Sequence, residues 1–273
     1  MGRAVKTEAI VLRSMRYGEA DRILHLYTPG RGRVGAIAKG VRRARSRFGG
    51  RLEPFFRLRI ELHEGRGELL TVTGAQTVDA YARLREDAGA LDAAARACDA
   101  VGRLFETTEP HPGVFNLLCR ELALLDERAV GGDRAAGGVE KAPGEDGRVQ
   151  PVGVQPVGSR AGALAFRLKL LLAAGLAPQL GACASCGERD HLVGFSGAAG
   201  GVVCAACEAG SFALGEHAYR FMTDAFAAPL HEAPDAPDAA LGQVERAISS
   251  TLEHHANLRL MPASRRAARI AVS

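Results

Sequence analysis

The sequence predicts an α+β fold: an N-terminal five-stranded β-barrel, then an α-helical domain that carries an inserted four-cysteine, zinc-binding element. Three observations lead to this prediction. Short β-branched segments separated by glycine and proline fill the first part of the chain, segments with helical periodicity follow, and two Cys-x-x-Cys motifs interrupt them. The expected divisions are 1–80 for the barrel, 81–182 for the first helices, 183–210 for the cysteine element and 211–273 for the last helices.

Five strands are expected in the barrel. Turn residues such as PGRG and EGRGE separate segments with β-branched, roughly alternating patterns. Five short strands spaced in this way suit a small closed or sandwiched antiparallel sheet. The general expectation is a sheet with one polar, basic face, and the more specific one is a five-stranded oligonucleotide-binding (OB) barrel. The expected strands cover residues 5–17, 23–28, 33–39, 54–65 and 68–78.

Helices are expected after Tyr81. Leu91, Ala94, Cys98 and Val101 recur with helical spacing in an alanine-rich segment. Residues 131–162 are instead rich in glycine, proline and charge, so they cannot bury enough apolar surface to offset their chain entropy, and we expect a flexible insertion there. The expected helices cover residues 84–106, 115–128, 162–177, about 215–228 and about 240–260.

Charge is unevenly distributed along the chain. The 273 residues carry 35 Lys and Arg against 31 Asp and Glu, a formal net charge of +4. Residues 1–80 hold 16 basic and 8 acidic side chains, and the remainder holds 19 and 23. This asymmetry points to a polyanionic partner for the N-terminal region.

The sequence contains no evident targeting segment. The start of the chain lacks an apolar run long enough for a signal peptide, and the most apolar run, residues 162–177, is broken by Arg167 and Lys169. We therefore expect a cytoplasmic protein with no membrane partner. Because cytoplasmic thiols stay reduced, the six cysteines are interpreted as metal ligands or buried thiols before disulfides.

The two cysteine motifs carry the strongest signal. Their spacing is Cys-x2-Cys-x17-Cys-x2-Cys, within the range of zinc ribbons. Two residues between thiolates let both sulfurs of a knuckle face one tetrahedral ion at about 2.3 Å, and glycines at 187, 200 and 201 permit the tight backbone. Between the knuckles, LVGFS and GGVVC resemble a short hairpin. The predicted ligands of one structural Zn²⁺ are Cys183, Cys186, Cys204 and Cys207.

Other interpretations of these cysteines are less favoured. A redox Cys-x-x-Cys pair would use one knuckle and not two, whereas an iron–sulfur cluster also takes four thiolates. Four protein ligands would close the coordination sphere, which argues against catalytic zinc. Asp190 and His191 between the knuckles are expected to be surface loop residues. Cys98 and Cys119 lie singly on apolar helical faces and are expected to be buried thiols.

A second signal is the basic stretch AKGVRRARSRFGG, residues 38–50. From Arg31 to Arg59 the chain has ten basic residues and one acid, Glu53. A solvated loop is the ordinary explanation, but flanking strands would give these charges a rigid platform. Phe48, Phe55 and Phe56 could stack on bases, although one of the pair Phe55 and Phe56 is expected to be buried. Sparse aromatics favour binding that is indifferent to base sequence.

Catalytic motifs are missing. The sequence has no Walker loop, no GxSxG and no HExxH, so the chain is predicted not to be an enzyme. Glu8, Glu19 and Asp21 have no spacing that would place them together as a metal site. His254 and His255 lie in a predicted helix and cannot point the same way.

As a set, these residues resemble the RecO family of bacterial DNA repair proteins. The matching segments are TEAIVLRSMRYGEADRILHLYTPGRGRVGAIAKGVRRARSRFGGRLEPF (7–55), HEGRGEL (63–69), PQLGACASCG and FSGAAGGVVCAAC. Together they cover most of the chain, and the insertion at 131–162 departs from the family pattern. The resemblance implies an N-terminal OB barrel, a helical domain and a zinc-binding element.

The resemblance also implies a function: a recombination mediator, associated with the nucleoid, that binds single- and double-stranded DNA and anneals complementary strands. With RecR it would help load RecA onto single strands coated by the single-stranded DNA-binding protein SSB, whose acidic C-terminal tail it would bind. Arg265, Arg266 and Arg269 are candidates for contacting that tail. The candidate DNA-binding residues are Arg31, Arg33, Lys39, Arg42, Arg43, Arg45, Arg47 and Arg51.

Two other functions remain open from the sequence. One is a nuclease or other DNA-processing enzyme on the same OB and zinc-ribbon scaffold. The other is an RNA- or ribosome-associated factor of similar architecture, because a basic surface does not distinguish RNA phosphates from DNA phosphates.

Overall fold

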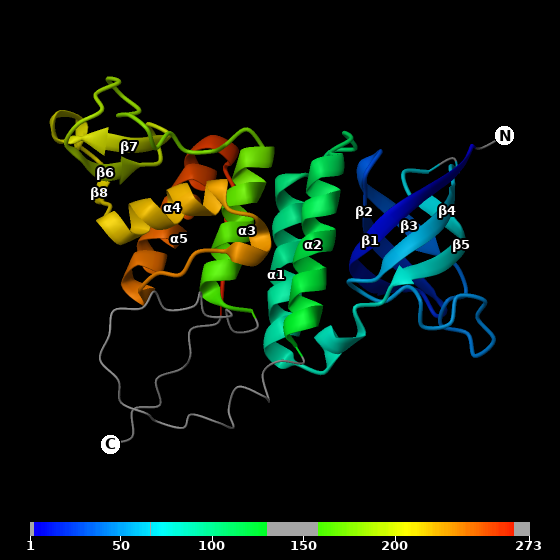
Figure 1. Ribbon diagram of the computed structural model, residues 1–273. Coiled ribbons are helices and arrows are strands. Elements are labelled where there is room, and N and C mark those ends of the chain that lie inside the picture. Colours follow the sequence, from blue (N-terminus) through cyan, green and yellow to red (C-terminus); the bar gives the residue numbers. More distant parts are fainter. Residues whose placement is uncertain (1–2, 66, 130–157, 265–273) are drawn as a thin grey trace, which may run out of the picture.

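The computed structural model describes residues 3–65, 67–129 and 158–264 (Figure 1). A β-barrel lies at one end, helices α1 and α2 lie beside it, and helices α3 to α5 follow. A small sheet lies at the far end, packed above α4 and α5. Within the described ranges no helix has the length and apolarity needed to cross a membrane.

Five strands form a closed barrel in the order β1-β2-β3-β5-β4. All neighbours are antiparallel except β3 and β5, which pair in parallel at Ala36–Leu70 and Ile37–Thr71. This order is consistent with an OB-type barrel. The prediction of a five-stranded barrel followed by helices and a cysteine element is confirmed. The strands are β1 (Ala4–Tyr17), β2 (Asp21–Thr28), β3 (Gly32–Ala38), β4 (Arg57–His63) and β5 (Leu70–Asp79).

The barrel interior is filled by alternate strand residues, and the loop between β3 and β4 adds to it. Leu24 and Ile60 belong to the same buried cluster as Val41, Phe48 and Leu52 of that loop. Phe48 is only 2% exposed, so the expectation that its ring could stack on bases is wrong. An aromatic ring flanked by cations contributes more by completing the barrel core than by facing water.

The other aromatic expectation is confirmed, because Phe55 is buried and Phe56 is half-buried. Phe55 also holds the end of the loop against β1: its backbone N–H donates to the carbonyl of Val11 at 2.7 Å.

N-cap residues set the first residue of helices α1 and α3. Asp87 accepts a hydrogen bond from the N–H of Ala90 at the start of α1, and Ser159 accepts one from Gly162 at the start of α3. Helix α3 therefore starts two residues earlier than expected, and residues 131–157 of the expected insertion lie outside the described residues. The helices are η1 (Ala82–Arg85), α1 (Ala88–Leu104), α2 (Pro112–Arg128), α3 (Arg160–Ala173), α4 (Glu216–Ala227), η3 (Leu230–Glu232) and α5 (Asp238–Ala256).

The barrel and the helices share one apolar interface. Ile10 and Tyr27, on the outer side of β1 and β2, are fully buried in the same cluster as Phe105 and Phe115 of the helical part. The rings of Tyr27 and Phe105 meet edge to face, with centroids 6.4 Å apart. At Gly32 an added Cβ would lie 2.5 Å from the carbonyl oxygens of Thr107 and Glu109, so only glycine permits this approach.

The segment after α5 returns across the helices and is held by arginines. Arg96 and Arg103 of α1 donate to the carbonyls of Pro262 and Arg259, each at 2.6 Å. The buried Arg167 of α3 donates to the carbonyl of Met261 at 2.5 Å. These bonds tie the end of the described chain to the middle of the bundle.

We predict that Glu121 of α2 makes stability depend on pH. Glu121 is buried, and burial raises the pKa of its carboxyl to about 7. The folded state therefore holds a proton that the unfolded chain releases near pH 4.5, so stability falls as pH rises from about 4.5 to about 7. The cost at higher pH is about 3 kcal/mol. Urea unfolding at about pH 5 and about pH 8 measures it.

Glu121→Gln removes this pH dependence, and Glu127→Gln, an exposed position on the same helix, is the matched control. An equal pH dependence in wild type and Glu121→Gln would contradict the prediction.

Candidate metal centre and nucleic-acid interface

The cysteine element is a small three-stranded sheet of order β7-β6-β8, formed by β6 (Leu192–Ser196), β7 (Gly201–Cys204) and β8 (Phe212–Ala213). The predicted hairpin is confirmed, and β8 was not predicted because two residues carry no periodicity. The element docks on α5: an added Cβ at Gly197 would overlap Ser250, and the His255 Nε2 lies 2.8 Å from the Gly197 carbonyl oxygen. Helix α5 therefore packs against the sheet of the cysteine element and supports it.

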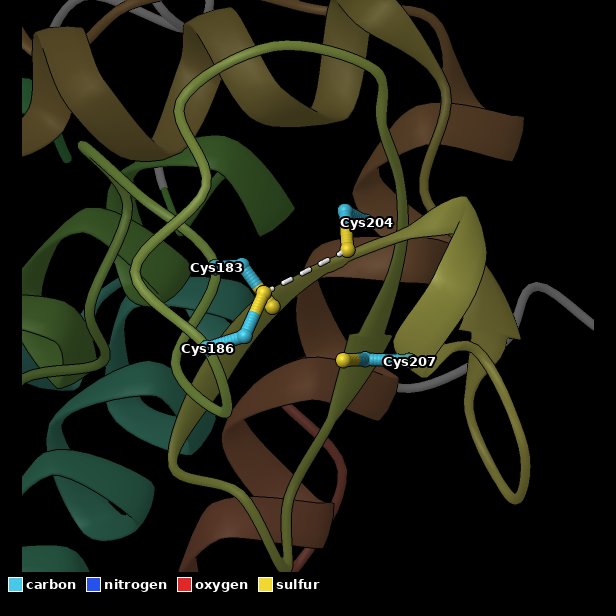
Figure 2. A group of neighbouring side chains, drawn as sticks. All are labelled: Cys183, Cys186, Cys204 and Cys207. Carbon is cyan, nitrogen blue, oxygen red and sulfur yellow. Dashed lines mark hydrogen bonds between the residues drawn. The ribbon is translucent and has the colours of Figure 1, made fainter.

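The four predicted ligands come together at one point of this element (Figure 2). Cys183 and Cys186 lie on the knuckle before β6, Cys204 ends β7, and Cys207 follows on η2 (Ala205–Cys207). Their Sγ atoms all lie within 4.8 Å of one another, and those of Cys186 and Cys204 are 3.7 Å apart. A tetrahedral ion with metal–sulfur bonds of about 2.3 Å requires sulfur–sulfur edges of about 3.8 Å. The geometry thus fits a single metal ion.

Glycine shapes the first knuckle and the hairpin. Gly187 has φ of +82° and donates its N–H to the carbonyl of Cys183, which turns the chain between the two thiols. Gly201 lies so close to the backbone of Gln179 that an added Cβ would overlap it. This contact pairs the segment around Gln179, which precedes Cys183, with strand β7, which ends at Cys204.

The electrostatics of the four thiols require a cation if all are to ionise. Backbone hydrogen bonds, that of Cys204 first, lower the pKa of Cys183 to about 6. Hydrogen bonds with Cys186 and Cys204 raise the pKa of Cys207 to about 12. One thiolate thus forms readily at Cys183, and the thiol of Cys207 stays protonated. Four thiolates at this spacing would repel one another. A divalent ion that binds all four sulfurs compensates this repulsion, and it leaves no open coordination position.

The two remaining cysteines differ from these four. Cys98 is buried, which raises the pKa of its thiol, as predicted for a core residue. Cys119 is half-buried, and desolvation raises its pKa to about 11. Neither thiol is close to the four-cysteine group, which is the one candidate metal group among the described residues.

The basic stretch forms the loop 39–56, a chain of turns that β3 and β4 flank as expected. Backbone bonds such as Arg43 N–H to Gly40 O and Ser46 N–H to Arg43 O stabilise consecutive turns. The loop is anchored to the β1–β2 turn, where Asp21 accepts from the N–H of Gly40 at 2.7 Å. Buried side chains of the same loop hold it from inside the barrel.

Six of the eight candidate DNA-binding side chains lie exposed on this loop. None of the six forms an ion pair with a residue that the structure describes, and two of them donate only to backbone carbonyls. We call these residues the arginine loop: Lys39, Arg42, Arg43, Arg45, Arg47 and Arg51.

Arg31 and Arg33 are placed differently. Arg31 pairs with Glu64 at 2.6 Å. Arg33 donates to the carbonyl of Gly102 on α1 at 2.9 Å and contacts His25. Both side chains are half-buried, at the end of β3 opposite to Lys39, which corresponds to about 25 Å along the strand. They are therefore not brought together with the arginine loop.

Carboxylates near the N-terminus are used for structural contacts. Glu8 accepts two hydrogen bonds from Arg57, at 2.9 and 2.7 Å, and Asp21 binds the loop backbone. Two further cations, Lys6 and Arg59, lie beside Arg47 around a common pocket and were not assigned from the sequence. Only the register of β1 against β4 shows that they share a face.

The fold and these two sites define a class of protein: a barrel with an uncompensated cationic loop, coupled through helices to a four-thiolate centre. Family comparisons agree with this. The N-terminal model of Recombination protein O matches residues 1–81, and the C-terminal model matches residues 155–262.

Named relatives extend over most of the chain. DNA repair protein RecO of Anaeromyxobacter sp. (strain K) is 35% identical over 94% of this chain and 93% of its own length. The RecO protein of Rubrobacter xylanophilus is 39% identical over 74% of this chain and 71% of its own length. The chain belongs to the RecO family, and the predicted resemblance is confirmed.

We predict that loss of one knuckle removes the metal and unfolds the element around it. A ribbon of this size has little core of its own and depends on the ion for folding energy. In Cys183→Ser with Cys186→Ser, metal content measured by mass spectrometry falls from one ion per chain to none. Cys119→Ser is the control and retains the ion. Metal retained by the double variant at full stoichiometry would contradict the assignment.

Proposed function

We propose that this protein is a DNA repair and recombination mediator that binds single- and double-stranded DNA and anneals complementary strands. With RecR, it would help load RecA onto single strands coated by SSB. The observation that carries the proposal is the arginine loop, in which six exposed cations have no acidic partner among the described residues and are anchored to the barrel. Membership of a family whose relatives are named as DNA repair proteins supports it.

The physics of annealing suits such a surface. Two complementary strands repel each other through their phosphates, and a dense cationic face lowers that repulsion and releases condensed counterions. Phosphate contacts do not read bases, so binding would be indifferent to sequence. No covalent bond need change, and we propose that the chain is not an enzyme.

We propose that the barrel is an OB-fold DNA-binding domain and that the four cysteines hold one structural Zn²⁺. Sulfur atoms within 4.8 Å of one another suit a single ion better than an iron–sulfur cluster, in which the cysteines bind two or more separate iron atoms. The protein would act in the cytoplasm, in association with the nucleoid.

For the partner SSB, an acidic tail would require a cationic rim beside an apolar groove. The candidate residues Arg265, Arg266 and Arg269 lie outside the described residues. Their role remains a proposal, and unchanged affinity for an SSB tail peptide after their charge reversal would remove it.

Two experiments separate the proposal from its rivals. Incubation with labelled DNA and Mg²⁺ would give shortened products only if the protein were a nuclease. Competition between single-stranded DNA and RNA of equal length, at fixed salt, distinguishes a DNA-binding protein from an RNA-associated factor.

We predict that reversing the charge of the arginine loop abolishes annealing. In the variant with Arg42, Arg43, Arg45 and Arg47 changed to Glu, annealing of SSB-coated complementary oligonucleotides falls to the uncatalysed rate. Metal content and thermal unfolding stay close to wild type, because these four side chains are exposed and form no ion pair among the described residues. The control changes Arg120 and Arg220, exposed on α2 and α4, to Glu. Normal annealing by the loop variant would contradict the proposal.

We also predict a marked salt dependence. If about five cations contact phosphates, the slope of log affinity against log salt on single-stranded DNA is about −3.5. Fluorescence anisotropy over a series of salt concentrations measures this slope. A slope near zero would mean that binding is not governed by phosphate contacts.

A further inference from the structure

A polar pocket lies on the outer face of β1, β4 and β5, next to the arginine loop. Its volume is about 420 Å³, and its walls come from all three strands and from Arg47 of the loop. Small-molecule sites span roughly 300–1,000 Å³, so the pocket is large enough for one small polar unit. The side chains that matter for its chemistry are Lys6, Arg47, Arg59, Glu61 and Gln76 around Gly74.

Strand register brings these residues onto one face. Lys6 of β1 pairs with Glu61 of β4, which pairs with Gly74 of β5. In the neighbouring row, Arg59 of β4 pairs with Gln76 of β5. Directly paired residues of antiparallel strands point to the same side of a sheet, and residues two apart on one strand do as well. Both rows therefore present their side chains to the pocket.

Gly74 makes the pocket hollow. The backbone at this position does not require glycine: its φ lies outside the left-handed region, and an added Cβ would meet only the carboxylate end of Glu61, at 3.0 Å. Glycine inside a strand lowers stability and often marks a place where a ligand approaches the backbone closely. Because Gly74 has no side chain, the centre of the outer face of β1, β4 and β5 is left open among long polar side chains.

The charges around this hollow do not cancel. Glu61 is the one acid in the lining and pairs with Lys6 at 2.6 Å. Arg59 and Arg47 form no ion pair with any residue in the described ranges, and the Arg47 guanidinium lies 4.8 Å above the ring of Phe48. Two guanidinium groups are thus left to bind an anion, and guanidinium groups match the geometry of phosphate oxygens.

The other side of the barrel is closed to a ligand. The outer face of β2, and of β1 around Ile10, is packed against α1 and α2, where Ile10 and Tyr27 are fully buried. A strand held by the arginine loop can therefore continue over β1, β4 and β5 and not over β2. Arg47 belongs to both the loop and the pocket, so the two cationic surfaces are continuous.

We infer that this pocket binds one unpaired nucleotide of a single DNA strand whose neighbouring phosphates lie on the arginine loop. Arg47 and Arg59 hold the phosphate, the floor at Gly74 and Ala75 receives the sugar or base, and the Gln76 amide offers hydrogen bonds to it. The pocket has room for a single nucleotide but not for a base pair, so a duplex contacts the loop alone. The inference rests on the proposed function, and it adds a reason for preferring unpaired strands.

The test compares Gly74→Leu, which fills the hollow without changing charge, with Arg59→Gln, which removes one guanidinium. The probes are a fluorescent oligo-dT and a duplex of equal length, measured by anisotropy. Gly74→Leu is expected to weaken single-strand binding about tenfold and to leave duplex binding unchanged. Arg59→Gln is expected to weaken single-strand binding more than duplex binding and to reduce the single-strand salt slope by about 0.7.

Arg220→Gln, on the exposed side of α4, is the matched control and should bind both probes like wild type. If Gly74→Leu does not fold, Arg59→Gln decides, and equal losses on both probes overturn the pocket. Wild-type single-strand affinity in both variants would also overturn it, while the proposed function would stand as long as the loop variant fails to bind. A wild-type protein that binds neither probe would overturn the proposed function itself.

Discussion

The cations of the arginine loop repel one another, and the buried apolar side chains of the same loop stabilise its compact conformation against that repulsion. Six cations within thirteen residues would favour an expanded chain in water. Val41, Phe48 and Leu52 alternate with them and are buried inside the barrel, and burial of such side chains stabilises by roughly 1.5–3 kcal/mol each. The loop therefore presents concentrated positive charge that no acid in the described part of the chain pairs with, and a polyanion would be attracted to such a surface.

The cysteine centre also brings like charges close together, but here the charges are negative thiolates. Four sulfurs within 4.8 Å cannot all ionise unless a cation lies between them, because four thiolates at this spacing would repel one another. At the loop the compensating charge would come from DNA, whereas at the cysteines it would come from an ion. The first site is exposed to a partner, whereas four thiolates around one ion would leave no open coordination position at the second.

The helical part decides which surface of the barrel is free. By burying Tyr27 and engaging Arg33, α1 and the segment after it cover the side formed by β1 and β2. The free side of β1, β4 and β5 then lies next to the arginine loop, and Arg47 joins the two. At the other end, α5 carries the cysteine sheet through Ser250 and His255. The helices thus act as a spacer that orients both sites.

Local features of the sequence determined the strands, the helices and the four candidate metal ligands, because alternation, helical spacing and Cys-x-x-Cys knuckles depend on residues near one another in the chain. The family followed from the same motifs. Only the tertiary structure decided which cations are paired: Arg31 and Arg33 have partners far along the chain, whereas Arg45 has none within the described ranges. It also decided that Phe48 is buried and that Lys6, Arg59 and Gly74 share a face. Ion pairing, burial and strand register depend on contacts between distant segments, which no local pattern encodes.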